Sequence, residues 1–176
     1  YILEPKVLEY VPENEPFMFE YGVFPQLLER SERFYAYIWR GYWKDIGTSA
    51  SYLAANMDVL AGRVKILEPP SHEQGEKFDS AAQIDSISVV HPSRSVKAEA
   101  QIINSAIAGN CFIEERARIE NSVIRGGSRI GAGAVVKDAV IGKGCHVGRS
   151  VTIGRGTILG DKSVLTDFSS AGDIES

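Results

Sequence analysis

Residues 130–158 decide the fold, and they read Ile130-Gly-Ala-Gly-Ala-Val, Val136-Lys-Asp-Ala-Val, Ile141-Gly-Lys-Gly-Cys-His, Val147-Gly-Arg-Ser-Val-Thr and Ile153-Gly-Arg-Gly-Thr-Ile. Every segment opens with a branched aliphatic residue, and glycine follows it in four of the five. From Ile130 to Ile158 the opening residues follow one another at steps of six, five, six, six and five residues. A short unit that returns at a fixed period indicates a repeat architecture. The same spacing is therefore expected on both sides of this stretch.

The opening aliphatic residues form three columns with a period of 17 residues. The columns are Val90, Ile107, Ile124, Ile141 and Ile158; Val96, Ile113, Ile130, Val147 and Val164; and Ile102, Ile119, Val136 and Ile153. The fifth residue of a segment is small: Ala100, Cys111, Ala117, Ser128, Ala134, Cys145, Val151 and Thr157. We predict a three-sided prism whose narrow interior holds the aliphatic side chains, with glycines turning its corners. Its turns would stack as parallel strands about 4.8 Å apart. Three columns in register argue against an ordinary sandwich with chance spacing.

These segments resemble the hexapeptide-repeat family, whose fold is a left-handed parallel β-helix. The resemblance implies such a domain at 84–168, in a chain that is mainly β, and the left hand comes from the resemblance alone. Prisms of this family serve both acyltransferases and non-catalytic assembly domains, so the fold does not choose a function.

Composition excludes several classes of protein. The 176 residues carry a net charge of −4, and no basic helix or aromatic–basic platform suggests a nucleic-acid binder. No apolar run approaches the length of a membrane span, and no signal peptide is recognisable. Cys111 and Cys145 lie 34 residues apart, which is two turns of the predicted prism. That separation is too long for a disulfide, so we expect two buried thiols and a reducing, cytoplasmic compartment.

Residues 1–67 do not repeat, and they look like α/β material too short to close a sheet. We expect a short helix over 6–10, a helix carrying Pro25 in its first turn, a strand over 34–39 and a helix over 50–60. Thr48 or Ser49 would cap the last helix and Gly62 would end it. Residue 1 is a tyrosine within an apparent strand, so the chain reads as beginning inside a domain. Prolines and charges predict a linker over 68–83.

The sharpest local motif is Gly41-Tyr-Trp-Lys-Asp-Ile-Gly-Thr48. Asp45 follows a predicted strand and precedes a helix cap, where a carboxylate can point into a ligand cleft. The alternative is a turn aspartate that bonds local backbone N–H groups. The residues themselves leave both interpretations open.

Together with Tyr1-Ile-Leu-Glu-Pro, Phe19-Glu-Tyr-Gly-Val-Phe-Pro and Tyr52-Leu-Ala-Ala-Asn, this motif resembles the C-terminal half of the catalytic domain in sugar-1-phosphate nucleotidyltransferases. The resemblance is to mannose-1-phosphate guanylyltransferases and to glucose-1-phosphate adenylyl- or thymidylyltransferases, and we lean toward mannose 1-phosphate and GTP. It implies a nucleoside triphosphate and a sugar 1-phosphate as substrates, with Asp45 as one of two aspartates that hold Mg²⁺. It also places Glu20 on the sugar side of the pocket, and Lys44 is a weaker phosphate candidate.

The sequence departs from that family in two places. Many relatives have lysine and then an acid after the glutamate, where this chain has Tyr21 and Gly22. The Gly-rich loop that cradles the triphosphate, Gly-x-Gly-Thr-Arg-Leu, has no counterpart here. We therefore expect the chain to be inactive alone and to work as a homo-oligomer or with a missing N-terminal half.

Two other functions remain open at this level. A hexapeptide prism can transfer acetyl groups by means of a histidine, and His146 is the candidate, although it should point outward. The chain can also be a non-catalytic assembly or regulatory module, because prism sides and exposed end turns can pair.

Overall fold

The computed structural model describes residues 1–64 and 81–173, and it divides the chain into two compact units, Tyr1–Gly41 and Tyr42–Ser176. Each unit is described by itself. The predicted linker over 68–83 lies almost entirely outside the described residues.

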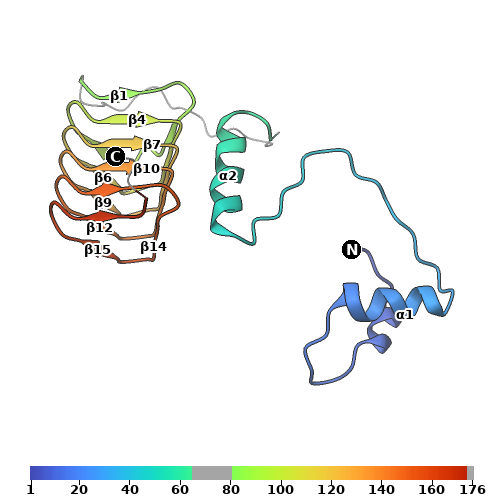
Figure 1. Ribbon diagram of the computed structural model, residues 1–176. Helices are drawn as coiled ribbons and strands as arrows, with labels where there is room; N and C mark the ends of the chain where they lie inside the picture. The colour runs from blue at the N-terminus through green and yellow to red at the C-terminus, as the bar shows by residue number, and fades with distance from the viewer. Residues whose placement is uncertain (65–80, 174–176) are drawn as a thin grey trace. The chain divides into compact units, whose positions relative to one another are not determined.

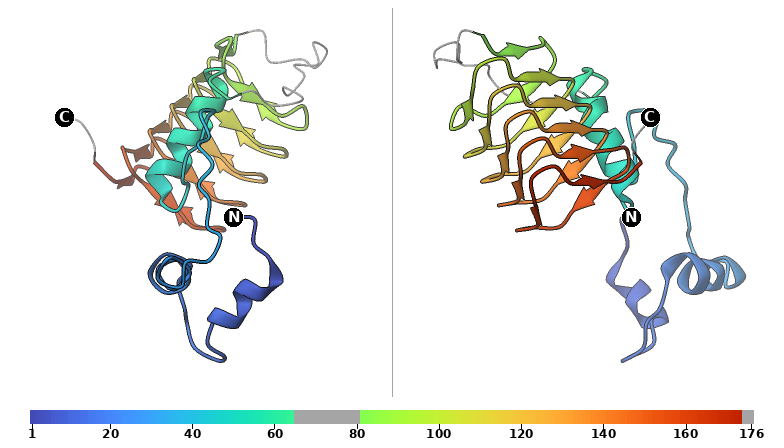
Figure 2. Two further views of the ribbon diagram at one scale, coloured as in Figure 1. Left: turned by 90° about the vertical axis from the view of Figure 1, so that its right-hand side faces the viewer. Right: turned by 60° about the vertical axis from the view of Figure 1, so that its left-hand side comes forward.

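Most of the second unit is a parallel β-helix, in which successive turns stack as rungs (Figures 1 and 2). The first sheet contains β1 (Gln83–Ile84), β4 (Gln101–Ile103), β7 (Arg118–Glu120), β10 (Val135–Lys137), β13 (Thr152–Ile153) and β16 (Ser170–Ala171). The second contains β2 (Val89–Val90), β5 (Ala106–Ile107), β8 (Val123–Ile124), β11 (Val140–Ile141) and β14 (Ile158–Leu159). The third contains β3 (Ser95–Val96), β6 (Phe112–Ile113), β9 (Arg129–Ile130), β12 (His146–Val147) and β15 (Val164–Leu165). Each strand pairs with the strand three places along the chain, so three sheets form the three predicted sides.

The interior consists of the aliphatic columns read from the sequence. Ile102, Ile119, Val136 and Ile153 pair in register along the first sheet, and each is 0% exposed. The small fifth residues Ala100, Cys111, Ala117, Ser128, Ala134, Cys145 and Val151 are buried as well. Each inward aliphatic side chain contributes roughly 1.5–3 kcal/mol on burial. The prism prediction is confirmed for these turns.

The last turn corrects two members of the predicted columns. Ile158 and Val164 face outward, with 52% and 66% of their surface exposed. Leu159 and Leu165 take the inward places, because they pair with Ile141 and Val147. The corner after Ile153 holds one residue more than the corner after Val136, so the period changes from 17 to 18 residues. Since side chains alternate across a strand, a shift of one residue exchanges the inward and outward faces.

Two glycines show two different reasons for glycine in this fold. Gly144 adopts a φ of +63°, which is the strained corner conformation expected from the sequence. Gly131 has no such φ, but a Cβ atom there would lie 2.6 Å from the carbonyl carbon of Gly148 in the next turn. The glycine after an inward aliphatic residue therefore lets neighbouring turns approach closely.

A ladder of buried serines runs along one corner and joins successive turns. Ser88, Ser105 and Ser122 are at most 1% exposed. The backbone N–H of Ser105 donates to Ser88 Oγ at 3.0 Å, and that of Ser122 donates to Ser105 Oγ at 3.0 Å. The N–H of Ala139 then donates to Ser122 Oγ at 3.1 Å, where the ladder ends. These hydroxyls satisfy corner N–H groups that would otherwise be buried without a partner.

Replacing Ser122 by alanine is expected to lower the free energy of unfolding by about 1–3 kcal/mol, because the buried N–H of Ala139 loses its acceptor. Chemical denaturation of the purified chain measures this change. Ser163→Ala is the matched control, because Ser163 Oγ only donates to the Gly160 carbonyl of its own turn. An equal loss in both variants would contradict a stabilising role for the ladder.

The first unit contains three short helical segments. A 3₁₀ helix, η1 (Pro5–Tyr10), precedes a π-helical turn, η2 (Phe19–Val23), which leads directly into α1 (Phe24–Glu29). Pro25 lies in the first turn of α1, as the sequence predicts. Val23 and Leu27 are buried, and the rings of Phe24 and Phe34 lie 5.1 Å apart.

The strands predicted over 34–39 and at the first residues of the chain are wrong for this structure, because neither segment forms a strand. Tyr35 and Tyr37 are 83% and 86% exposed. A strand needs a neighbouring strand to pair its backbone groups, and the described part of this unit offers none.

In the ranges 1–64 and 81–173, no helix is long and apolar enough to cross a membrane.

Candidate functional site

The segment before α2 (Ser49–Leu60) carries the motif singled out in the sequence. Thr48 caps this helix: its side chain accepts from the N–H of Ser51 at 3.1 Å, while Ser51 Oγ accepts from the N–H of Thr48 at 3.2 Å. Gly62, with a φ of +70°, follows the end of the helix. The predicted cap and stop are therefore confirmed, and the cap fixes the chain immediately after Asp45.

Asp45 is exposed, and its Oδ1 accepts a hydrogen bond from the N–H of Gly47 at 2.9 Å. This is the turn-aspartate geometry, which was the alternative left open by the sequence. Within the described residues, no other hydrogen bond or ion pair involves this carboxylate. One of its oxygens is thus available to a ligand.

Lys44, the neighbouring candidate, is engaged in an ion pair. Its Nζ lies 2.5 Å from Oδ2 of Asp58, which is in the last turns of α2. The hydroxyl of Tyr42 donates to the same oxygen at 2.8 Å, and Arg63 donates to Oδ1 from Nε at 2.8 Å and from Nη2 at 2.5 Å. Hydrogen bonds from Lys44, Arg63 and Tyr42 hold the pKa of the Asp58 carboxyl well below its usual range. Asp58 is therefore an ionised hub that sequence reasoning did not single out.

Glu20 lies in the first unit, in the first turn of η2. Its Oε1 accepts a hydrogen bond from the hydroxyl of Tyr1 at 2.6 Å, which lowers the pKa of Glu20 and raises that of Tyr1. A Cβ atom at Gly22 would lie 2.1 Å from the ring of Phe17, so any larger residue at this position would need that ring to move. Tyr21 is 80% exposed.

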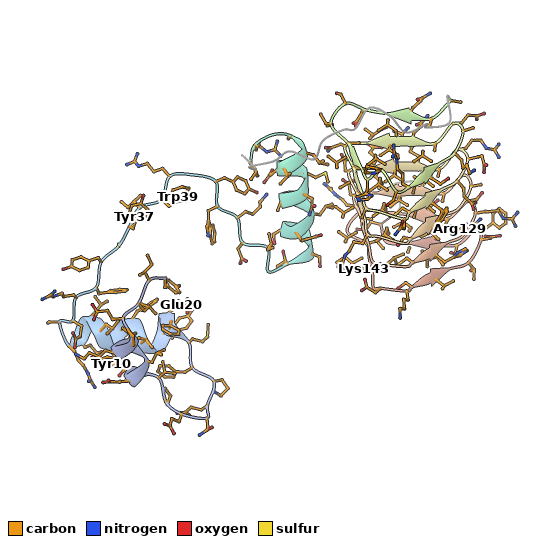
Figure 3. The ribbon with its side chains drawn as sticks, turned by 180° about the vertical axis from the view of Figure 1, so that it is seen from behind. Tyr10, Glu20, Tyr37, Trp39, Arg129 and Lys143 are labelled. Atoms are coloured by element: carbon orange, nitrogen blue, oxygen red, sulfur yellow. The ribbon has the colours of Figure 1, made fainter. Side chains whose placement is uncertain are left out.

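Asp45, Lys44 and Glu20 line neither of two hollows found among the described residues. One cleft of about 620 Å³ lies in the first unit and is bordered by Lys6, Tyr10, Phe17, Arg30 and Glu32, among others. A groove of about 250 Å³ lies on the third sheet of the β-helix. Figure 3 labels Tyr10 and Glu20 in the first unit and Arg129 on the β-helix.

The groove on the β-helix holds His146, which is exposed and points outward as predicted. The cations around it already have acidic partners: Arg129 pairs with Glu114, and Arg149 Nη2 lies 2.7 Å from Asp167 Oδ2. The bonds from Arg149 lower the pKa of Asp167. The charged side chains that line the groove are therefore paired with one another, and no unpaired cation among them is left to bind an anionic acyl carrier.

The described side chains supply few of the ligands that a Mg²⁺ ion needs. Carboxylate oxygens are ligands that Mg²⁺ prefers, but its octahedral shell needs several of them. The described residues contain no group of three histidine, cysteine or acidic side chains suited to a metal. Asp45 has the right chemistry for one ligand, and further ligands must come from outside these residues. Cys111 and Cys145 are free, buried thiols, as predicted.

Comparison with known proteins adds two family matches in the order expected from the motifs. The nucleotidyl transferase family matches residues 1–62, and the family described as the EIF2B subunit epsilon LbH domain matches residues 72–169. The chain belongs to the sugar-1-phosphate nucleotidyltransferases that carry a hexapeptide-repeat β-helix. The β-helix of this nucleotidyltransferase chain is accordingly the left-handed form.

Curated relatives match long stretches of this chain. Glucose-1-phosphate adenylyltransferase of Geobacillus stearothermophilus is 36% identical over 115 residues, which are 65% of this chain and 27% of the relative. The enzyme of the same name from Desulfitobacterium hafniense (strain DSM 10664 / DCB-2) is 30% identical over 153 residues, covering 86% of this chain and 35% of the relative. The chain thus spans about a third of their length. Among solved structures, perosamine N-acetyltransferase from Caulobacter crescentus matches with a TM-score of 0.33 at 14% identity, over 53% of this chain and 50% of that chain.

Proposed function

We propose that this chain is the C-terminal part of an enzyme that joins a sugar 1-phosphate to a nucleoside triphosphate, forming a nucleotide sugar and pyrophosphate. The observation that carries the proposal is the succession of a nucleotidyl transferase match and an LbH match along one chain. The names of the curated relatives favour glucose 1-phosphate and ATP as the substrates. The earlier preference for mannose 1-phosphate and GTP stays a prediction that the same assay can judge.

In the proposed reaction a phosphate oxygen of the sugar 1-phosphate attacks the α-phosphorus of the triphosphate, and pyrophosphate leaves. Mg²⁺, when bound, would neutralise the charge that builds on the phosphate oxygens. Asp45 would supply one carboxylate ligand from the exposed segment before α2. Glu20 would face the sugar, and the hydrogen bond from Tyr1 lowers the pKa of its carboxyl. Lys44 would support the segment rather than bind phosphate, because its charge is already paired.

We assign the β-helix a role in assembly or regulation rather than in acyl transfer, because its outward histidine lies in a groove whose charges are already paired. The two buried free thiols are consistent with a reducing, cytoplasmic location. A homo-oligomer built through β-helix surfaces is part of the same proposal.

The test is an assay of pyrophosphate release by the product of the complete reading frame in which this sequence lies. We expect release that needs both ATP and glucose 1-phosphate, and none from the 176-residue chain alone. Release only with mannose 1-phosphate and GTP would keep the reaction and change the substrates. No release with glucose or mannose 1-phosphate and any of ATP, GTP or dTTP would overturn the proposal.

A further inference from the structure

Asp58 joins residues on both sides of α2. Tyr42 and Lys44 come from the segment before the helix, and Arg63 follows it. The Asp58 side chain is only 13% exposed, and its two oxygens accept four hydrogen bonds. An ion pair that is mostly shielded from water and shared among three donors is stronger than an isolated surface pair. This hub is therefore a fixed point on the helix.

The segment that carries Asp45 is consequently attached to α2 at two places. On its C-terminal side, Thr48 is fixed at the first turn by the reciprocal bonds with Ser51. On its N-terminal side, Lys44 is fixed to Asp58, ten residues further along the helix. Ten residues of helix span about 15 Å, so the segment has to run back along α2 for Lys44 to reach Asp58. Asp45 lies between these two attachments.

We propose that Asp58 is a positioning residue that, through Lys44 and Tyr42, holds the backbone of Asp45 in one place along α2. The inference rests on the proposed function, in which Asp45 is a metal ligand. A ligand on a loop restrained at both ends loses less conformational entropy when the metal and phosphates bind. The inference also gives Lys44 a role: it is the link between the hub and the ligand.

The first experiment measures hydrogen exchange in the 176-residue chain by mass spectrometry, over the peptide covering 42–48. In Asp58→Asn we expect exchange in this peptide about tenfold faster, because one end of the segment is released and local opening becomes easier. Asp58→Glu, which keeps the charge, should restore part of the protection. Asp167→Asn is the matched control, since it breaks a comparable arginine–carboxylate pair in the β-helix. Unchanged exchange in Asp58→Asn would overturn the inference.

The second experiment measures the kinetics of the complete enzyme. Asp58→Asn should lower kcat by about 10- to 100-fold with the KM values for both substrates within about twofold, as expected for a misplaced reactive group. The Lys44→Met and Asp58→Asn changes should not be additive, because each breaks the same link. A normal kcat in Asp58→Asn would contradict the inference while leaving the proposed function intact. An inactive wild-type enzyme would count against the proposed function, and the exchange result would still decide whether Asp58 holds the segment.

Discussion

Replacing Ile113 by aspartate is expected to abolish cooperative folding of the β-helix. Ile113 lies in β6 with 0% exposure, between Val96 and Ile130 of the neighbouring turns. A carboxylate there would have no cation or N–H group to pair with, and the penalty for burying such a charge is several kcal/mol. That penalty is comparable with the whole stability of a typical domain, which is about 5–15 kcal/mol. The milder change Ile113→Ala should cost about 2–5 kcal/mol.

The adjacent residue provides the control for this prediction. Phe112 lies in the same strand with its side chain outward and 55% exposed. Phe112→Asp introduces the same charge one residue away, so it should leave the thermal unfolding transition within a few degrees of wild type, as surface changes usually do. Circular dichroism during heating measures both variants. A cooperative transition in Ile113→Asp, or its loss in Phe112→Asp, would show that the inward and outward faces have been assigned wrongly.

The β-helix was predictable because its signal is repeated. Each inward aliphatic residue, such as Ile119 or Val136, has counterparts one turn before and after it, so a single misplaced residue hardly affects the pattern. The signal fails at the last turn, where Ile158 and Leu159 stand side by side and both are apolar. Only the pairing of Leu159 with Ile141 decides which of them points inward. The first turn also takes an 18-residue step, from Ile84 to Ile102, so the 17-residue columns describe only the turns between the first and the last.

The first unit was less predictable for a physical reason. The helices η1 and α1 have local signals, such as Pro25 in the first turn of α1, and both were expected, whereas the π-helical turn η2 was not. The strand expected over 34–39 depends instead on a neighbouring strand, and such a partner is not found among the described residues of this unit. The alternating aromatic and aliphatic residues favour a strand over 34–39, but a strand forms only where a second strand pairs with it.

The residues of the candidate site were likewise predictable only where their signal is local in the sequence. Asp45 was found because it belongs to a contiguous motif, Trp-Lys-Asp-Ile-Gly-Thr. Asp58 was missed because its partners Tyr42, Lys44 and Arg63 are spread over 22 residues and meet only when α2 forms. One signal was present in the sequence: an aspartate near the C-terminal end of a helix is unfavourable there, since cations are preferred at that end. A misplaced charge of this kind indicates that a partner lies nearby.

Replacing Asp45 by asparagine is expected to lower kcat of the complete enzyme by at least about 100-fold, because the loss of one metal ligand removes several kcal/mol of charge stabilisation in the transition state. This change distinguishes the two interpretations of Asp45. Asparagine keeps an Oδ1 acceptor for the N–H of Gly47, so the turn and the fold should persist while the negative charge is lost. If Asp45 were only a turn residue, the variant would retain its activity.

The control for Asp45→Asn is the same chemical change in the β-helix. Asp138 occupies a corner with a φ of +49°, and the equivalent corners hold Asn104 and Asn121 at +44° and +47°. Since asparagine tolerates this conformation well, Asp138→Asn should change neither activity nor stability by a measurable amount. Titration of the complete enzyme with Mn²⁺, followed by electron paramagnetic resonance, gives a second measurement, because Asp45→Asn should weaken metal binding and Asp138→Asn should not. Full activity and unaltered Mn²⁺ binding in Asp45→Asn would show that Asp45 only stabilises the local turn. The metal ligands of the enzyme would then lie outside the segment before α2.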